Sequence, residues 1–201
     1  HVYGAFPSTK ISESQMTIPT NPSGLTHLLA ENVCNMFNAN SDIKCLNIRL
    51  SNSYGSPLLG DKNCWSLVVN DLCRSVFERG EIELKSDGSA LRDFIHYQDI
   101  FETLSSVIDL PVTEYKNTFH LSSNITYSIY ELAHLVQSVF RKRYGKDVRI
   151  SILKKSESNQ TSEKRYTIDN SGLRAFGANT SMNIEAGILE LFDYLDQHGQ
   201  D

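Results

Sequence analysis

The chain has 201 residues and a formal net charge of −5; 40% of its residues are hydrophobic and 21% are charged. This composition is that of an ordinary globular protein and excludes collagen, coiled coils and disordered tails. A chain of this length buries a sufficient core without disulfides, so we expect one domain or slightly more. Acidic and basic residues are interspersed and form no broad basic surface, which argues against nucleic acid as a partner.

The chain shows no run of about 18 hydrophobic residues, and its N-terminal segment lacks the basic and apolar regions of an export signal. We therefore expect a cytoplasmic protein with no membrane partner. The cysteines have no C-x-x-C spacing and lie in hydrophobic patterns, so we expect reduced core thiols, not disulfides, and no metal site. They are Cys34, Cys45, Cys64 and Cys73.

The first third of the chain reads as helix, strand, loop and helix. Hydrophobic residues at helical spacing predict a helix at Gly24–Ala39, and a short apolar run predicts a strand at Cys45–Leu50. Glycine and proline predict a loop at Ser51–Lys62. A second helix follows at Trp65–Phe77 and ends at Gly80, a common helix terminator.

The middle of the chain combines strands with one helix. A strand is predicted at Glu81–Ser86 and another at Leu91–Tyr97, where apolar residues alternate. Asp99 has the side chain of a helix N-cap, which predicts a helix at Ile100–Asp109. A further short strand is predicted at Thr118–Leu121.

The last third begins with a long predicted helix at Ser128–Tyr144. Its Ser-x-x-Glu start, completed by Glu131, is a capping-box pattern. A strand is predicted at Val148–Leu153, a polar loop at Lys154–Glu163 and a final amphipathic helix at Ile184–His198. The alternation of strands and helices along the whole chain predicts an α/β fold.

Several separate motifs occur in one order along the chain. They are Val2-Tyr3-Gly4, Ser23-Gly-Leu-Thr-His27-Leu-Leu-Ala-Glu31, Arg49-Leu-Ser-Asn52-Ser-Tyr54-Gly55, Asp87-Gly88, Arg92-Asp-Phe-Ile-His96-x-x-Asp99, Phe119-His-Leu-Ser-Ser, Ser128-Ile-x-Glu131, Asp169 and Phe176-Gly177. In this order they resemble the extended short-chain dehydrogenase/reductase family, the NAD-dependent sugar-nucleotide epimerases and dehydratases. The resemblance implies a nucleoside-diphosphate sugar as substrate and NAD or NADP as cofactor.

The resemblance also places the family's catalytic Tyr and Lys at Ser23 and His27. In the family the Tyr exchanges a proton with a sugar hydroxyl, while the Lys lowers the pKa of that Tyr and holds the nicotinamide ribose. An aliphatic hydroxyl does not ionise usefully near neutral pH, so Ser23 is a poor base. His27, which also takes the family's cofactor-binding position, accepts a proton but supplies no fixed positive charge.

The family's glycine-rich turn, which sets the cofactor pyrophosphate against a helix N-terminus, is absent from this sequence. The chain therefore resembles the second half of such a protein, with an incomplete Rossmann-like parallel sheet and a small α/β substrate-binding domain. We expect the sheet domain at 1–55 and 91–123 and the substrate domain at 56–90 and 124–201. We expect no NAD binding by this chain alone, and a homo-oligomer or docking onto the missing N-terminal half.

By the same resemblance, Asn52 and Arg92 contact the diphosphate of the substrate, and Asn63 and Leu84 lie along the nucleotide. A guanidinium suits this role because its rigid fork of donors matches phosphate oxygens. The alternative for Arg92 is a surface ion pair with a neighbouring aspartate, which adds little stability. Arg165 is a weaker candidate for a phosphate contact, and a solvated loop is its alternative.

Three hypotheses for function follow. The first is an epimerase or dehydratase homologue that is catalytically impaired or incomplete in this chain. The second is a non-catalytic module that binds a nucleotide sugar or associates with another subunit. The third takes Ser23 and His27 as nucleophile and base for acyl transfer, but nothing in the sequence resembles a nucleophile elbow or a third triad member.

Overall fold

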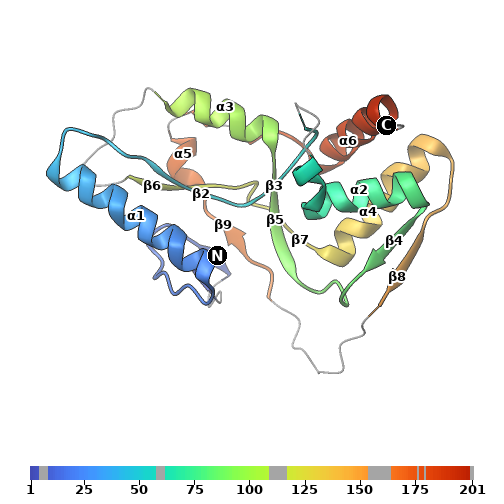
Figure 1. The fold of residues 1–201 in the computed structure, drawn as a ribbon, viewed down its shortest axis with the longest axis horizontal. Coiled ribbons are helices and arrows are strands. Elements are labelled where there is room, and N and C mark those ends of the chain that lie inside the picture. The colour runs from blue at the N-terminus through green and yellow to red at the C-terminus, as the bar shows by residue number, and fades with distance from the viewer. Residues whose placement is uncertain are drawn as a thin grey trace.

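The structure is a computed structural model that describes residues 1–4, 9–57, 62–108, 117–153, 164–175, 177–178 and 180–199. The predicted polar loop at Lys154–Glu163 lies outside these residues, as does Phe176 of the motif near the C-terminus. Helices and strands alternate along most of the described chain (Figure 1). This confirms the predicted α/β class.

Several helices begin or end at residues with clear capping roles. Asn21 caps the first helix by accepting from the Gly24 amide, and Ser128 and Glu131 form the predicted capping box. Gly80 and Gly145 close their helices in the left-handed conformation. The helices are α1 (Pro22–Asn40), η1 (Lys62–Ser66, a 3-10 helix), α2 (Val68–Arg79), α3 (Tyr97–Val107), α4 (Ile129–Tyr144), α5 (Ser171–Arg174) and α6 (Ile184–His198).

The strands pair mostly in parallel. They are β1 (Lys10–Ile11), β2 (Asn47–Leu50), β3 (Asn52–Tyr54), β4 (Glu81–Leu84), β5 (Leu91–His96), β6 (Thr118–Leu121), β7 (Thr126–Ser128), β8 (Arg149–Ile152) and β9 (Thr167–Ile168). The parallel pairs are β1 with β9, β2 with β6, β3 with β5, and β4 with β8. Only β7 runs antiparallel to its described partner, β5. Parallel pairing requires crossover connections, and helices supply several of them here.

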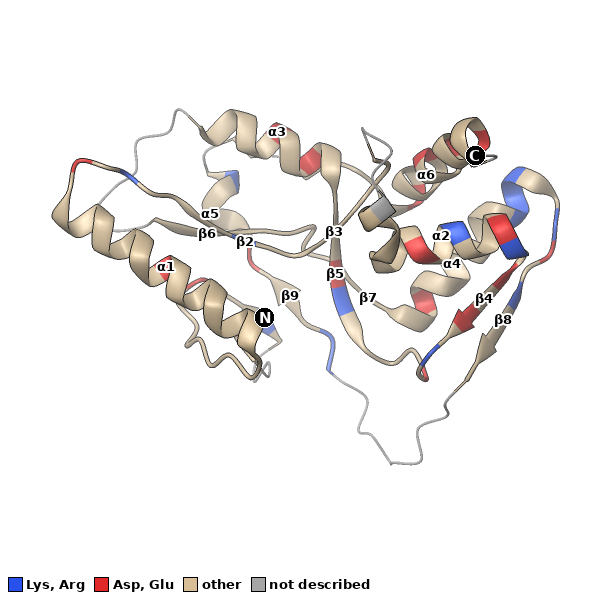
Figure 2. Ribbon diagram, viewed as in Figure 1, with Lys and Arg blue, Asp and Glu red and all other residues tan. Residues whose placement is uncertain are grey.

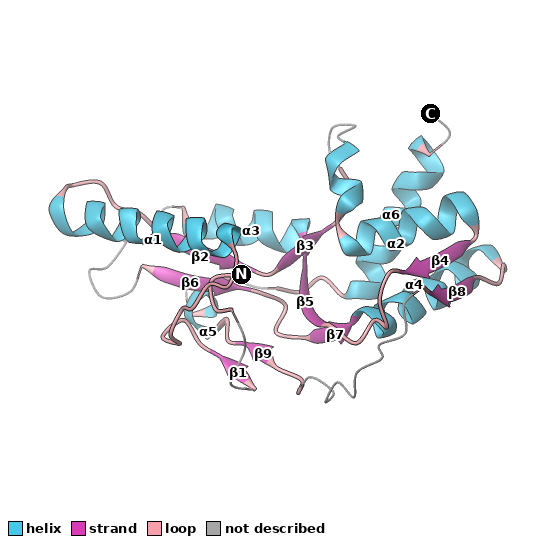
Figure 3. Ribbon diagram, turned by 60° about the horizontal axis from the view of Figure 1, so that its bottom comes forward, coloured by secondary structure: helices cyan, strands magenta, loops and turns pink. Residues whose placement is uncertain are grey.

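Two groups of elements lie on either side of β3, β5 and β7 (Figures 1 and 3). In one group α2, α4 and α6 pack together over β4 and β8 around the largest hydrophobic cluster, which includes Ile82, Val136 and Phe192. In the other, α1, α3 and α5 accompany β2 and β6, and Phe119 and Leu121 lie in a smaller core. A third, smaller cluster, which includes Val2, Ile11 and Tyr166, also contains Leu91 of β5. The described residues thus form three hydrophobic clusters, the largest in one group of elements.

One segment does not follow the predicted domain boundaries. We expected all of 124–201 in the substrate domain, but β9 pairs with β1 and α5 contacts β6 in the other group. Leu173 and Ala178 complete the core around Phe119. The chain therefore returns to the first group after β8, a crossing that no local sequence pattern encodes.

Two local predictions need correction. The predicted loop at Ser51–Lys62 contains β3, whose three residues pair in parallel with β5 and are too few to show alternation. Asp99 is not the N-cap of α3, because the His96 ring nitrogen accepts from the Gln98 amide at 3.1 Å and fills that role. Asp99 instead accepts hydrogen bonds from the amides of Ser181 and Met182.

The four cysteines are free thiols, but only Cys73 is buried in a core and the other three are half-buried. The expectation of core thiols is therefore correct for Cys73 alone. Across the part of the chain that the structure describes, no three or more His, Cys, Asp or Glu side chains gather as a metal site would require. None of the described helices is long and apolar enough to cross a bilayer.

Candidate functional site

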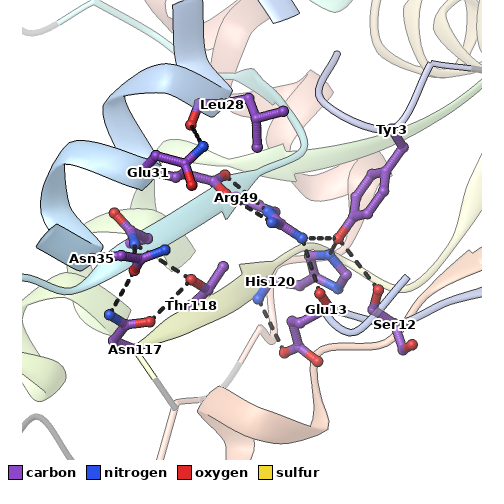
Figure 4. Close-up of polar contacts among 12 residues, drawn as sticks. Tyr3, Ser12, Glu13, Leu28, Glu31, Asn35, Arg49, Asn117, Thr118 and His120 are labelled. Atoms are coloured by element: carbon purple, nitrogen blue, oxygen red, sulfur yellow. Dashed lines mark hydrogen bonds and ion pairs between the residues drawn. The ribbon is translucent and has the colours of Figure 1, made fainter. Parts of the chain in front are cut away.

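A polar network fixes α1 against the strands beside it (Figure 4). Arg49 on β2 donates from Nε to Glu31 Oε1 at 2.9 Å and from Nη2 to Glu31 Oε2 at 2.7 Å. Its Nη1 donates to the Tyr3 hydroxyl at 2.6 Å and to the Glu13 carbonyl at 3.1 Å. One guanidinium therefore joins the helix, the strand and two segments of the N-terminal region.

The network continues to His120 on β6. Its Nδ1 donates to the Asp169 carbonyl at 2.9 Å, so in the neutral ring Nε2 is left to accept from the Tyr3 hydroxyl, with which it is in contact. Burial lowers the pKa of His120, and burial raises the pKa of Tyr3 although Arg49 opposes the change. Both shifts favour the neutral form of the group.

Ser23 and His27 lie near the N-terminal end of α1, and both are exposed. The Thr26 hydroxyl donates to the Ser23 carbonyl at 2.9 Å, and no described residue forms a hydrogen bond or ion pair with the His27 ring. Spacing of four residues puts the two side chains on one helix face.

Asn52 and Arg92 are brought together by the pairing of β3 with β5. The Asn52 amide donates to the Asp93 carbonyl at 2.9 Å, and Arg92 Nη1 donates to the Leu91 carbonyl at 2.7 Å. Both residues are exposed. Leu91, the residue before Arg92, lies in a hydrophobic cluster with Val2 and Tyr3, against which Leu28 of α1 packs. This part of α1 and these two side chains thus share one region.

Asp93 is a buried carboxylate that sequence reasoning did not single out. It accepts from the Ser123 amide at 2.9 Å and from the Ile125 amide at 3.0 Å, which orders the turn between β6 and β7. Burial raises its pKa, while these hydrogen bonds act in the opposite direction. An acidic residue inside the otherwise apolar end of β5 is the only sequence signal that could have identified it.

Arg165 lies near β7, and two of its nitrogens already have protein partners. Its Nη1 donates to the Thr126 carbonyl at 2.9 Å, and its Nη2 forms an ion pair with Glu131 on α4. The hydroxyl of Tyr166, which follows Arg165 in the chain, donates to the Leu91 carbonyl, and the same carbonyl also accepts from Arg92. Figure 2 accordingly shows basic residues on β5 and in the segment that leads into β9.

The other two predicted nucleotide contacts, Asn63 and Leu84, lie on η1 and β4. Asn63 is exposed on η1, where its carbonyl accepts from the Ser66 hydroxyl at 2.8 Å. Leu84 is 4% exposed and its side chain packs in the larger core. Leu84 is therefore a packing residue in this structure, because the alternation of β4 turns it inward.

His96 lies where the two groups of elements meet. It is 3% exposed, its ring packs edge-on against Tyr54, and its Nε2 is 3.4 Å from Glu190 Oε2 on α6. Gly187 on α6 permits this close approach, since a Cβ there would lie 2.6 Å from the Tyr54 hydroxyl. The ring is therefore packed and has no open side for a substrate.

The parallel α/β topology and the ordered motif residues define a class of dinucleotide-dependent enzyme folds. A model of the NAD dependent epimerase/dehydratase family matches residues 1–121, and the chain belongs to that family. The chain is 30% identical over 154 residues to UDP-glucose 4-epimerase of Mycoplasma genitalium, a match that covers 69% of this chain and 45% of the relative.

Solved structures of similar fold include UDP-glucuronic acid 4-epimerase from Bacillus cereus in complex with UDP-glucuronic acid and NAD. It matches with a TM-score of 0.75 and 22% identity over 98% of this chain and 59% of its own. RMD from Pseudomonas aeruginosa, complexed with NADPH, matches with a TM-score of 0.78 and 20% identity over 98% of this chain and 64% of its own. The chain spans less than half of the curated relative and about 60% of these structures.

Members of the family bind NAD or NADPH. Within this sequence the resemblance assigns one residue to the cofactor, His27, whose imidazole is exposed. The sequence has no glycine-rich turn for the pyrophosphate. These residues alone do not fit a dinucleotide, and no step of chemistry is assigned through one.

Proposed function

We propose that this chain supplies the nucleotide-sugar side of an NAD-dependent epimerase/dehydratase homologue whose proton-transfer pair is replaced by Ser23 and His27. The observation that carries the proposal is the exposed Arg92 guanidinium. It is anchored through one nitrogen to the carbonyl of Leu91, a residue of the cluster against which Leu28 of α1 packs, and it lies beside Asn52. Its other donors suit the diphosphate of a nucleoside-diphosphate sugar.

The same geometry argues against proton transfer by this chain. A phenol with an ordinary pKa of about 10 is brought toward neutrality by an adjacent cation, but the hydroxyl of Ser23 has no useful acidity. His27, one turn further along α1, is exposed and holds no fixed charge. The proposal is therefore binding without efficient catalysis.

Titration calorimetry of the chain with UDP-glucuronic acid and with UDP-glucose tests the proposal. We expect Arg92→Ala to weaken binding by about 10- to 150-fold, which corresponds to the 1.5–3 kcal/mol typical of a hydrogen bond to a charged group. Arg92→Lys should retain part of the affinity, because an ammonium keeps the positive charge but lacks the paired, planar N–H donors of a guanidinium. Arg141→Ala is the matched control, since Arg141 is 70% exposed at the far end of α4.

A second candidate, a subunit-association module, is favoured by one feature of α1. Its outward face carries an apolar stripe, a pattern typical of an interaction surface when it is exposed. The stripe residues are between 39% and 55% exposed, and they are Leu25, Leu29, Val33, Met36 and Phe37. If neither UDP-sugar binds and the chain sediments as a dimer across a concentration series, nucleotide-sugar binding is refuted and association is supported.

A further inference from the structure

Two cysteines meet where α1 turns back toward the sheet. Cys34 lies on α1 and Cys45 lies two residues before β2, and both are half-buried. Figure 1 shows the short connection that brings the end of α1 to the start of this strand segment. Neither thiol belongs to the Arg92 region or to the polar network of Arg49.

The backbone of Cys45 is clamped onto the helix by Asn38. The Asn38 side chain donates to the Cys45 carbonyl at 3.0 Å and accepts from the Cys45 amide at 2.7 Å. Asn38 follows Cys34 by one helical turn, so both project from the same face of α1. The clamp therefore fixes Cys45 against the part of the helix surface that carries Cys34.

The two thiols also interact with each other. The pKa of the Cys34 thiol is raised by burial and further by the neighbouring Cys45 thiol. A protonated thiol reacts slowly in exchange, and its reactivity grows as the pH rises. Cys73, in contrast, is fully buried in the largest hydrophobic cluster, and Cys64 lies on a different element, η1.

We propose that Cys34 and Cys45 are a modification site at which a small-molecule disulfide such as oxidised glutathione converts the two thiols into an intramolecular disulfide. One cysteine thiolate attacks the glutathione disulfide and releases one glutathione thiol, leaving a mixed disulfide. The second cysteine thiolate attacks that mixed disulfide, forms the Cys34–Cys45 bond and releases a second glutathione. The two cysteine sulfurs are oxidised, the glutathione disulfide is reduced, and both thiol protons end on the released glutathiones.

Such a bond closes a short loop that contains the end of α1 and the turn into β2. A native-like cross-link stabilises a protein mainly by restricting the unfolded chain, provided that the folded geometry accepts the bond without strain. For a loop of this size in a chain of about 200 residues, we expect the Tm of the oxidised protein to rise by about 5 °C or more. The clamp by Asn38 supplies the preorganisation that limits strain.

Peptide mapping of the folded chain tests the proposal. The protein is incubated with oxidised and reduced glutathione near pH 8.5, where more thiolate is present, quenched in acid, alkylated and digested with trypsin without reduction. Trypsin cleaves after Lys44 and separates the two cysteines into the peptides Ile11–Lys44 and Cys45–Arg49. Only a disulfide joins these peptides, and the peptide Asn63–Arg74, which holds Cys64 and Cys73, reports on the other thiols.

We expect the joined peptide, the loss of two hydrogens from the intact mass, and an increased Tm. Cys34→Ser should stop the reaction at a glutathione adduct on Cys45, whereas the control Cys64→Ser should still form the joined peptide. Stable glutathione adducts on the wild-type pair, or linkage of either cysteine to Cys64, would overturn the proposal. A joined peptide with an unchanged or lowered Tm would equally show that the native geometry does not accommodate the bond.

Discussion

Removing the guanidinium of Arg49 should destabilise the fold far more than removing a typical surface charge. The Arg49 and Glu31 side chains are only 13% and 14% exposed, and their two hydrogen bonds are 2.9 and 2.7 Å long. In Arg49→Met the methylene stem remains, but the Glu31 carboxylate is left nearly buried without its partner. Breaking a buried pair in this way costs about 3–5 kcal/mol, and the residual exposure here favours the lower end, about 3 kcal/mol.

Urea unfolding followed by circular dichroism measures this loss directly. A cost of about 3 kcal/mol corresponds to a fall in Tm of roughly 6–12 °C for a chain of this length. Arg49→Met combined with Glu31→Gln should be more stable than Arg49→Met alone, because the unpaired charge is gone. Arg141→Met is the control, since Arg141 is 70% exposed and its pair with Asp147 adds at most about 1 kcal/mol. A loss at Arg49 no larger than the control would refute the reasoning.

Two further predictions concern buried groups. His96 and His120 both have pKa values lowered by burial, so between pH 6.5 and each folded pKa the unfolded chain binds protons that the folded chain does not. The free energy of unfolding should therefore fall as the pH drops below about 6.5, by up to about 1.4 kcal/mol per pH unit for each histidine. Urea unfolding from pH 7 to 5.5 checks this, and His120→Gln should give a shallower slope; equal slopes would contradict it. Gly187→Ala should destabilise by roughly 1 kcal/mol or more despite better helix propensity, because its Cβ meets the buried Tyr54 hydroxyl; an increased Tm would disprove this.

Local patterns predicted those elements whose stability is decided within a few neighbouring residues. The bounds of β6 and α6 are the predicted ones, and the capping box of α4 forms as expected. These segments carry a strong period or a cap whose partner lies one helical turn away. Glycine at position 80 ends α2 for the same local reason.

The elements that sequence reasoning missed depend on distant partners. β3, β7 and β9 have two or three residues each, too few for a periodic signal, and they exist because β5 and β1 supply their hydrogen bonds. Asp99 was assigned to a helix cap because its residue type allows that role. In the fold it binds amides from Ser181 and Met182, which no local pattern reveals. Short strands and long-range polar contacts are thus decided by tertiary structure.

In the candidate site, the residues that anchor α1 differ from the residues to which chemistry is assigned. Glu31 lies one turn beyond His27 on α1, and its ion pair with Arg49 holds the helix against β2. Ser23 and His27 are exposed, and among the described contacts neither side chain takes part in that network. Under the proposed function, the exchange of the family's Tyr and Lys for Ser23 and His27 leaves this anchoring of α1 intact but removes the acid and the fixed charge. Arg92 and Asn52 are held by β3 and β5 rather than by α1, so the proposed binding of a diphosphate would not require a Tyr or a Lys at positions 23 and 27.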